Sequence, residues 1–153
     1  MPRPPRSRRV QGPPRCISYK PAGIPRRELE HICLRVDEFE ALRLSDYEGM
    51  DQRDAAREMD ISPATFSRLI ASARFTLSRA IIEGKALQIE GGNVDYAHTL
   101  HRCGDCGDEA MVKMRLPIAN ANANADGRAC RHCGSEKVED MVETIQNRNS
   151  QPE

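Results

Sequence analysis

The sequence predicts a mainly α fold, with a helix-turn-helix domain followed by a small β-rich module built around four cysteines. Two observations support this prediction. Residues 51–84 show a short helix, a turn and a longer amphipathic helix, and two Cys-x-x-Cys pairs follow at 103–106 and 130–133. The 153 residues include 4% aromatic residues and no Trp, so one large core is not expected. The length suits one small domain with an accessory module.

The stretch DEFEALRLSDYEG predicts the first clear helix. Asp37 with Glu40 three residues later resembles a capping box, and Gly49 is a natural helix stop. Asp51 can cap a second, short helix that ends at Met59. Before these helices, the spacing of apolar residues allows either a helix or a short strand at residues 28–34.

Ser62-Pro63 interrupts an otherwise helical stretch and marks the start of a new helix. Proline inside a helix costs roughly 3 kcal/mol. At the first helical position its missing N–H costs nothing, and serine is a good N-cap. Asp60 stands in the turn where glycine is common, and aspartate tolerates left-handed backbone. Gly84 ends the helix. The predicted inward positions are Phe66, Leu69, Ile70, Ala73, Leu77, Ala80 and Ile81.

The outward face of this helix is predicted to contact DNA, although an ordinary helical hairpin in a bundle has the same apolar pattern. Small residues there allow close approach to a major groove, and Arg68 can offer two donors to guanine or one to a phosphate. Alternatively, Arg68 is a solvated surface charge. The predicted DNA contacts of the domain are Ser62, Thr65, Ser67, Arg68 and Ser72.

The formal net charge of zero hides a segregation of charge along the chain. Residues 1–27 carry +8, and residues 28–60 carry −7. Residues 1–18 combine proline with arginine, which predicts a flexible basic arm that binds phosphate, or alternatively a solvated tail. The predicted DNA contacts of the arm are Arg3, Arg6, Arg8 and Arg9.

The four organised cysteines predict a zinc ribbon within residues 94–142. Cys103, Cys106, Cys130 and Cys133 form two pairs separated by 23 residues, and four thiolates complete a closed tetrahedral site. We therefore expect structural Zn²⁺, with an iron–sulfur cluster as the alternative. The three nearby histidines, His98, His101 and His132, are expected to be spectators. The run ANANANADG predicts an exposed loop, and residues 143–153 a flexible tail.

Four segments together resemble a known family. They are YKPAGIP, DEFEALRLSDYEGMDQRDAAREMDIS, TFSRLIASAR and GKALQIEGGN, within residues 3–93. The family is an uncharacterised prokaryotic one of predicted DNA-binding proteins, with a helix-turn-helix similar to region 4 of sigma factors. The resemblance implies a sigma-region-4-like or winged-helix-like domain at 19–93 and a regulatory role, without a reaction. The chain departs from the family pattern at Pro63, Phe75 and Thr76, where basic residues are common, so the arm is expected to supply more of the phosphate contact.

These features predict a sequence-specific DNA-binding protein that regulates transcription. Its partner would be double-stranded DNA. One alternative is an adaptor whose acidic helices at 28–60 contact RNA polymerase or another regulatory protein. Another is a metal- or redox-responsive switch at the four cysteines. An enzyme is not expected, since the sequence has no phosphate loop or nucleophile–base pattern. No apolar run approaches the ~20 residues of a membrane span, so we expect a cytoplasmic protein. The oligomeric state is left open.

Overall fold

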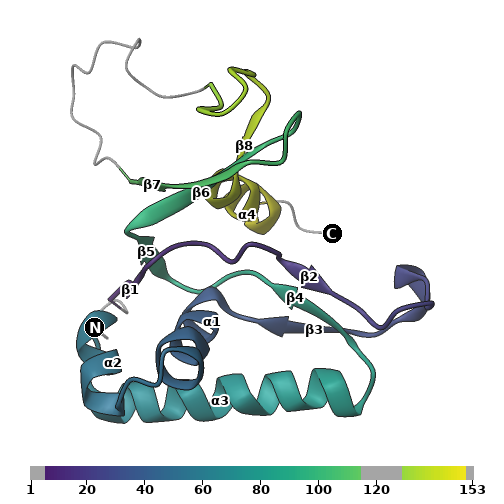
Figure 1. Cartoon of the computed structure of the whole chain (residues 1–153). Helices are drawn as coiled ribbons and strands as arrows, with labels where there is room; N and C mark the ends of the chain where they lie inside the picture. The colour runs from purple at the N-terminus through teal and green to yellow at the C-terminus, as the bar shows by residue number, and fades with distance from the viewer. Residues whose placement is uncertain (1–5, 115–128, 151–153) are drawn as a thin grey trace.

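Figure 1 shows the computed structural model of the chain, which describes residues 6–114 and 129–150. Along these residues, short strands precede a run of helices, and five strands and a final helix follow it. The helical elements are η1 (Arg26–Glu28), α1 (Val36–Leu42), the π-helical turn η2 (Arg43–Tyr47), α2 (Gln52–Glu58), α3 (Pro63–Ile82) and α4 (Met141–Asn149). The strands are β1 (Arg8–Val10), β2 (Ser18–Tyr19), β3 (His31–Leu34), β4 (Ala86–Ile89), β5 (Val94–Tyr96), β6 (His98–Cys103), β7 (Glu109–Lys113) and β8 (Val138–Asp140).

The fold is mixed α/β, so the prediction of a mainly α fold is wrong. Strand β4 pairs in parallel with β3 and antiparallel with β2, and β1 pairs in parallel with β5. These strands have two to four residues, which is too short to show the alternation of a half-buried strand. Their partners also lie far along the sequence, and local patterns carry no information about such pairing.

Two helices joined by a short turn, α2 and α3, form where the helix-turn-helix was predicted. Asp51 accepts hydrogen bonds from the backbone of residues 53 and 54, and Ser62 accepts one from the Thr65 N–H at 3.1 Å. Pro63 is the first residue of α3, so it begins a helix and does not kink one. Asp60 has a φ of 55°, the left-handed conformation that the turn requires.

The buried face of α3 packs against α1 and α2 and beneath the sheet β2-β4-β3 (Figure 1). Phe66, Leu69, Ile70 and Ala73 are buried there, as the periodicity predicted. The predicted inward position Ile81 is instead 74% exposed. Helices α1 and α2 pack along α3, but α2 reaches only the N-terminal half of α3. Near the C-terminal end of α3, no element among the described residues covers the side on which Ile81 lies.

From residue 6 onward the arm is folded against the body of the protein and is not a flexible tail. Its strand β1 pairs with β5, and Val10, Pro13 and Pro14 are buried. Arg8 forms an ion pair with Asp37, whose side chain is 2% exposed. Apolar contacts and neutralisation of a buried carboxylate therefore hold the arm to the body.

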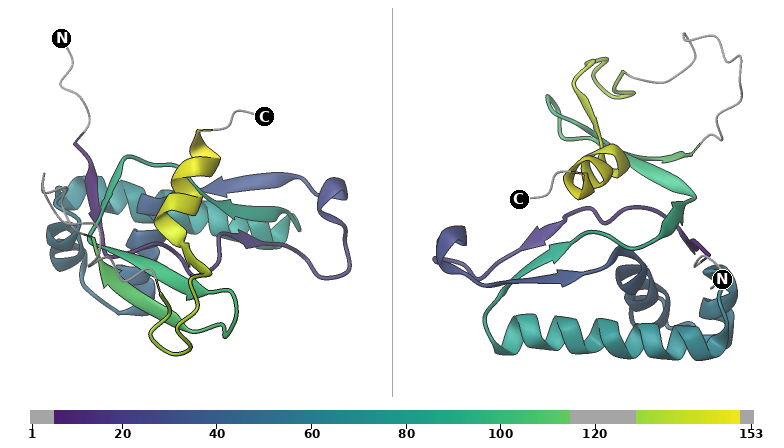
Figure 2. Two further views of the ribbon diagram at one scale, coloured as in Figure 1. Left: turned by 90° about the horizontal axis from the view of Figure 1, so that it is seen from above. Right: turned by 180° about the vertical axis from the view of Figure 1, so that it is seen from behind.

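The C-terminal module consists of the antiparallel sheet β7-β6-β8 and helix α4. The views in Figures 1 and 2 place it on the side of the arm that is opposite α3. Residues 141–149, predicted to lie largely in a flexible tail, form a helix because Asp140 caps it and Met141, Val142 and Ile145 are buried beside Leu100. The loop predicted from ANANANADG lies outside the described residues.

The module also contacts the arm directly. Arg102 donates to the backbone oxygen of Arg15 at 2.6 Å, and the end of the Met111 side chain lies over Gly12. None of the helices in the described parts of the chain is long and apolar enough to pass through a bilayer.

Candidate functional site

Each Cys-x-x-Cys pair lies on a turn of the same shape. The Gly107 N–H donates to the oxygen of Cys103 at 3.0 Å, and the Gly134 N–H donates to the oxygen of Cys130 at 2.9 Å. Both glycines have a φ of 74°, which disfavours any residue with a side chain. The two turns therefore present their sulfurs to each other from β6 and from the segment that precedes β8.

The four sulfurs form one cluster. The Sγ atoms of Cys103 and Cys133 are 3.6 Å apart, those of Cys106 and Cys130 are 3.5 Å apart, and all four lie within 4.8 Å of one another. A tetrahedral Zn–S site with bonds of ~2.3 Å has sulfurs ~3.8 Å apart. A disulfide requires ~2.05 Å. The arrangement therefore confirms a site that can hold a metal ion, and it is consistent with zinc.

The thiols of the cluster differ in acidity. Hydrogen bonds from Cys106 and Asp105 N–H groups lower the pKa of the Cys103 thiol to about 6, whereas burial and the neighbouring thiols raise the pKa of Cys106 to about 12. A metal ion binds the thiolate form of cysteine. The carboxylate of Asp105 then ties the two turns together, because it accepts from Ser135 Oγ at 2.6 Å and from Lys137 Nζ at 3.0 Å.

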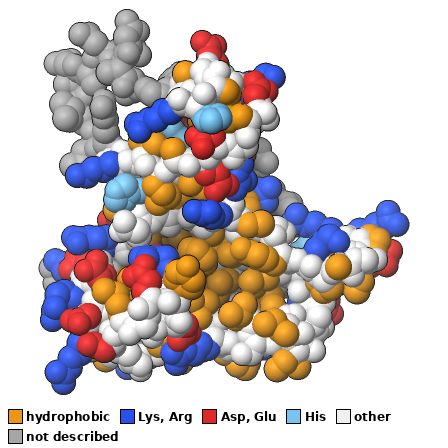
Figure 3. All heavy atoms as spheres, in the orientation of Figure 1, with side chains coloured by type: hydrophobic (Ala, Val, Ile, Leu, Met, Phe, Trp, Pro, Cys, Tyr) orange, Lys and Arg blue, Asp and Glu red, His pale blue; other side chains and the backbone are white. Residues whose placement is uncertain are grey.

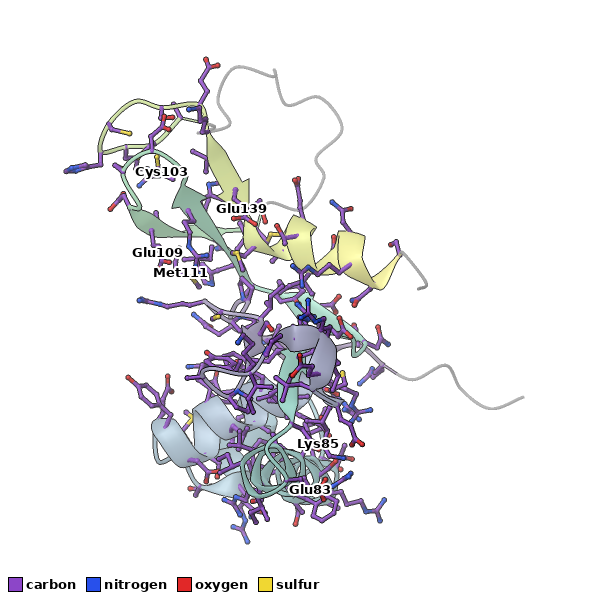
Figure 4. All side chains as sticks on the ribbon, turned by 90° about the vertical axis from the view of Figure 1, so that its right-hand side faces the viewer. Glu83, Lys85, Cys103, Glu109, Met111 and Glu139 are labelled. Atoms are coloured by element: carbon purple, nitrogen blue, oxygen red, sulfur yellow. The ribbon has the colours of Figure 1, made fainter. Side chains whose placement is uncertain are left out.

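The neighbouring histidines stand outside the sulfur cluster among the described residues. His101 Nε2 lies 3.2 Å from a carboxylate oxygen of Asp140, and His132 donates its backbone N–H to Cys130 Sγ at 3.4 Å. Figure 4 shows Cys103 at the end of the module that lies far from Glu83 and Lys85. The metal centre is thus remote from α3.

The helix-turn-helix presents an accessible polar surface at the start of α3. Ser67 and Arg68 are exposed, together with Ala64. Within the described chain, the Arg68 side chain makes no hydrogen bond or ion pair. Ser62 and Thr65 hydrogen-bond to each other at 2.8 Å in the helix cap. Arg68 is therefore an accessible cation among small residues, and its side chain is unpaired as far as the structure describes the chain.

Ser72 lies on α3 with the other predicted contacts and is exposed. Its hydroxyl donates to Glu38 at 2.6 Å and so joins α3 to α1. The Ser72 hydroxyl therefore has a partner within the protein.

The four arginines predicted to contact DNA from the arm fall into three groups. Arg6 and Arg9 are exposed, and the Arg9 N–H donates to the oxygen of Met59 at 3.1 Å, which holds the arm beside the turn of the helix-turn-helix. The Arg8 side chain forms an ion pair with Asp37 inside the protein. Arg3 lies outside the described residues.

A cluster of buried carboxylates on α1 was not anticipated. Asp37, Glu38 and Glu40 are 1%, 4% and 2% exposed. Their oxygens accept hydrogen bonds or ion pairs from Arg8, Arg35, Arg43, Ser72 and the backbone of Gln11. The sequence predicted these acids as helix-capping and surface charges, because Arg8 and Ser72 reach them from distant segments, although Arg35 and Arg43 stand at the two ends of α1.

Comparison with known proteins identifies relatives over most of the chain. A family profile described as "Protein of unknown function DUF134" matches residues 1–97. A UPF0251 protein of Chloroherpeton thalassium is 47% identical over 141 residues, which cover 92% of this chain and 87% of the relative. A UPF0251 protein of Halothermothrix orenii is 41% identical over 140 residues, which cover 92% and 100%. These names state no activity. Because the second alignment covers 92% of this chain, the similarity extends well beyond α2 and α3.

Proposed function

We propose that this chain, which belongs to the DUF134 family of proteins of unknown function, is a sequence-specific DNA-binding regulator of transcription with a structural zinc site. One observation carries the DNA-binding proposal. The first turns of α3 leave Ala64, Ser67 and Arg68 exposed on the side opposite the core. Small residues beside a free guanidinium suit the approach of a helix to the major groove.

Exposed arginines near this surface support contact with the DNA backbone. Arg9 lies on the strand that is hydrogen-bonded to the turn before α3, and Arg53 lies exposed at the start of α2. Neither side chain forms an ion pair among the described residues. Arginines of this kind add phosphate contacts that position a protein without selecting a sequence.

The zinc proposal rests on the closed set of four thiolates. Four protein ligands leave no open position for a substrate or a water molecule, which is typical of structural zinc sites. When bound, the metal would hold the two cysteine turns together and so stabilise the sheet β7-β6-β8. An iron–sulfur cluster also accepts four thiolates, and metal analysis with visible absorption of the purified protein distinguishes the two.

An adaptor function is less favoured by the surface of the protein. That alternative relied on the acidic helices within residues 28–60, but Asp37, Glu38 and Glu40 are buried and paired with internal groups. Asp54 is exposed, yet it pairs with Arg57 on the same helix at 3.1 Å. The acidic surface available to RNA polymerase or another regulatory protein is therefore smaller than the sequence suggested.

Replacing Arg68 with alanine tests the DNA-binding proposal. We first expect selection from a random duplex library to yield a preferred site for the wild-type protein. Arg68→Ala should then weaken binding to that site by roughly 10- to 100-fold and relax the preference at one position, because a bidentate contact to guanine contributes ~1–3 kcal/mol. Fluorescence anisotropy with labelled duplexes measures both effects.

Arg79→Ala is the matched control on the same helix. Arg79 is paired with Glu83 at 3.1 Å near the C-terminal end of α3, so its loss should leave affinity for the selected site unchanged. The proposal is wrong if selection enriches no sequence, or if the two variants bind the site equally.

A further inference from the structure

The front of the protein in Figure 3 has a broad apolar depression between the arm and α3. It is an open groove of about 1310 Å³. Its floor and walls come from β3, β4, α1 and α3, with Leu34, Phe39, Leu42, Leu77, Leu87 and Ile89 among the lining residues. A groove of this character on a protein surface is typical of an interaction site.

Large apolar side chains also stand exposed around this groove. Tyr47 is 87% exposed and Ile81 is 74% exposed, and both contribute to the groove lining. Tyr19 at 53% and Met111 at 50% lie on the same lining. At ~200 Å² for a fully exposed large side chain, these four offer roughly 500 Å² of apolar surface. An apolar patch of that size is comparable to the largest patch on a typical monomer, roughly 300–600 Å², and such patches are often functional.

We propose that this face is the interface between two copies of the chain, in which Tyr47 of each copy enters the groove of the other. A two-fold interface uses one surface on both partners, so that surface must carry both a projection and a hollow. Here Tyr47 is the projection and the groove is the hollow. Hydrogen bonds from Arg74 to Asp46 at 2.7 and 3.1 Å hold η2 against α3 and fix the base of Tyr47.

The exposed area agrees with what a stable dimer needs. A standard interface buries roughly 800 Å² on each partner, of which somewhat more than half is apolar. The roughly 500 Å² offered by the four side chains supplies that apolar share. Tyrosine at the centre of an interface is also among the residues that contribute most to affinity.

The position of the groove leaves the predicted DNA surface free. At ~100° per residue, Leu77 and Ile81 lie on the side of α3 away from Arg68, and Ile81, although only about 40° from Ser67 around the helix, is ~21 Å from it along the axis. Dimerisation through the groove would therefore keep both α3 outer faces exposed. Two such helices could contact two half-sites on one duplex, as helix-turn-helix dimers do. The dimer itself does not depend on DNA binding.

Sedimentation velocity of the full-length protein without DNA tests the interface. We expect the wild-type protein at micromolar concentration to have twice the 17.2 kDa mass of the chain. Tyr47→Glu should raise the dimer dissociation constant by at least ~30-fold, because the loss of a central tyrosine contact places a charge in an apolar groove. The exposed position of Tyr47 keeps its replacement from disturbing the core.

Phe75→Glu is the control with the same change in side-chain type and charge. Phe75 is 66% exposed on the outer side of α3 and does not line the groove, so this variant should remain dimeric. A monomeric wild-type protein, or a Tyr47→Glu variant that dimerises like the wild type, would overturn the proposal. Because no DNA is present, these outcomes are independent of the test of DNA binding.

A photo-crosslinker at position 47 tests the partner and the geometry together. When unlabelled protein carrying benzoylphenylalanine at this position is mixed with isotopically labelled chain, crosslinks should join position 47 of one copy to the groove strands of the other. Crosslinks that map elsewhere on the second copy, or only within one chain, contradict the proposed interface.

Discussion

Replacing Cys103 with serine is expected to abolish stoichiometric zinc binding and to unfold the module of β6, β7, β8 and α4. The buried apolar residues of this module are few, with Leu100, Met141, Val142 and Ile145 as the main ones. Zinc binding contributes roughly 10–16 kcal/mol to the folding of small zinc modules. Without the metal, this small core should not hold the sheet together.

Metal analysis and hydrogen exchange measure the two parts of this result. Wild-type protein should contain one zinc per chain and show slow exchange in residues 98–113 and 138–149, and a chelator should remove both properties. Cys33→Ser is the matched control, because Cys33 is an exposed free cysteine outside the cluster. Retention of slow exchange after complete metal removal would show that the module folds without it.

Replacing Arg8 with alanine should destabilise the protein by about 3 kcal/mol. The substitution leaves the carboxylate of Asp37, which is 2% exposed, without its closest cation. Removing one partner of a buried ion pair usually costs ~3–5 kcal/mol. We expect the lower end because Arg8 is 26% exposed and Arg35 remains 3.5 Å from Asp37. Urea unfolding followed by circular dichroism measures the change.

The adjacent residue provides the control. Arg9 is exposed and its side chain has no ion pair in the described structure, so Arg9→Ala should change stability by less than ~0.5 kcal/mol. If Arg9 contacts phosphate, the same variant should bind all duplexes more weakly and reduce the salt slope of binding by about 1. Equal stability of the two variants would show that the Arg8–Asp37 pair does not stabilise the fold.

Substitution of single arginines is a better test of the arm than deletion of residues 1–15. If the arm were a flexible tail, its deletion would change only the affinity for DNA. Because β1 and the Arg8–Asp37 pair lie within this segment, deletion would also remove part of the fold. Substitution of individual arginines separates charge from structure.

Most features set by neighbouring residues were predicted well, although the N-cap of α1 is Arg35 with Glu38 and not Asp37 with Glu40. Ser62 and Pro63 begin α3, Asp60 adopts the left-handed turn, and Gly84 follows the end of the helix with a φ of 62°. Each depends on the backbone preferences of one residue or on a hydrogen bond across three positions. The cysteine turns belong to the same class, since Gly107 and Gly134 occupy the positive φ that each turn requires.

Features that depend on distant residues were missed. The sheet that joins β2, β3 and β4 brings together residues separated by more than 50 positions. The buried acids of α1 have the same sequence appearance as surface acids. Their burial depends on partners from distant segments, which are Arg8 and the Gln11 backbone of the arm and Ser72 of α3. The hydrogen bond from Ser72 to Glu38, which joins α3 to α1, was not visible in the sequence either.

Local patterns along the chain were thus sufficient to predict the pair of helices α2 and α3 and the four cysteines that are placed to hold a metal ion, because both depend on residue type at short spacing. The mixed α/β architecture, the attachment of the arm and the apolar groove beside Tyr47 required the folded structure. They arise from contacts between segments far apart in the sequence, where burial and pairing change what each side chain does.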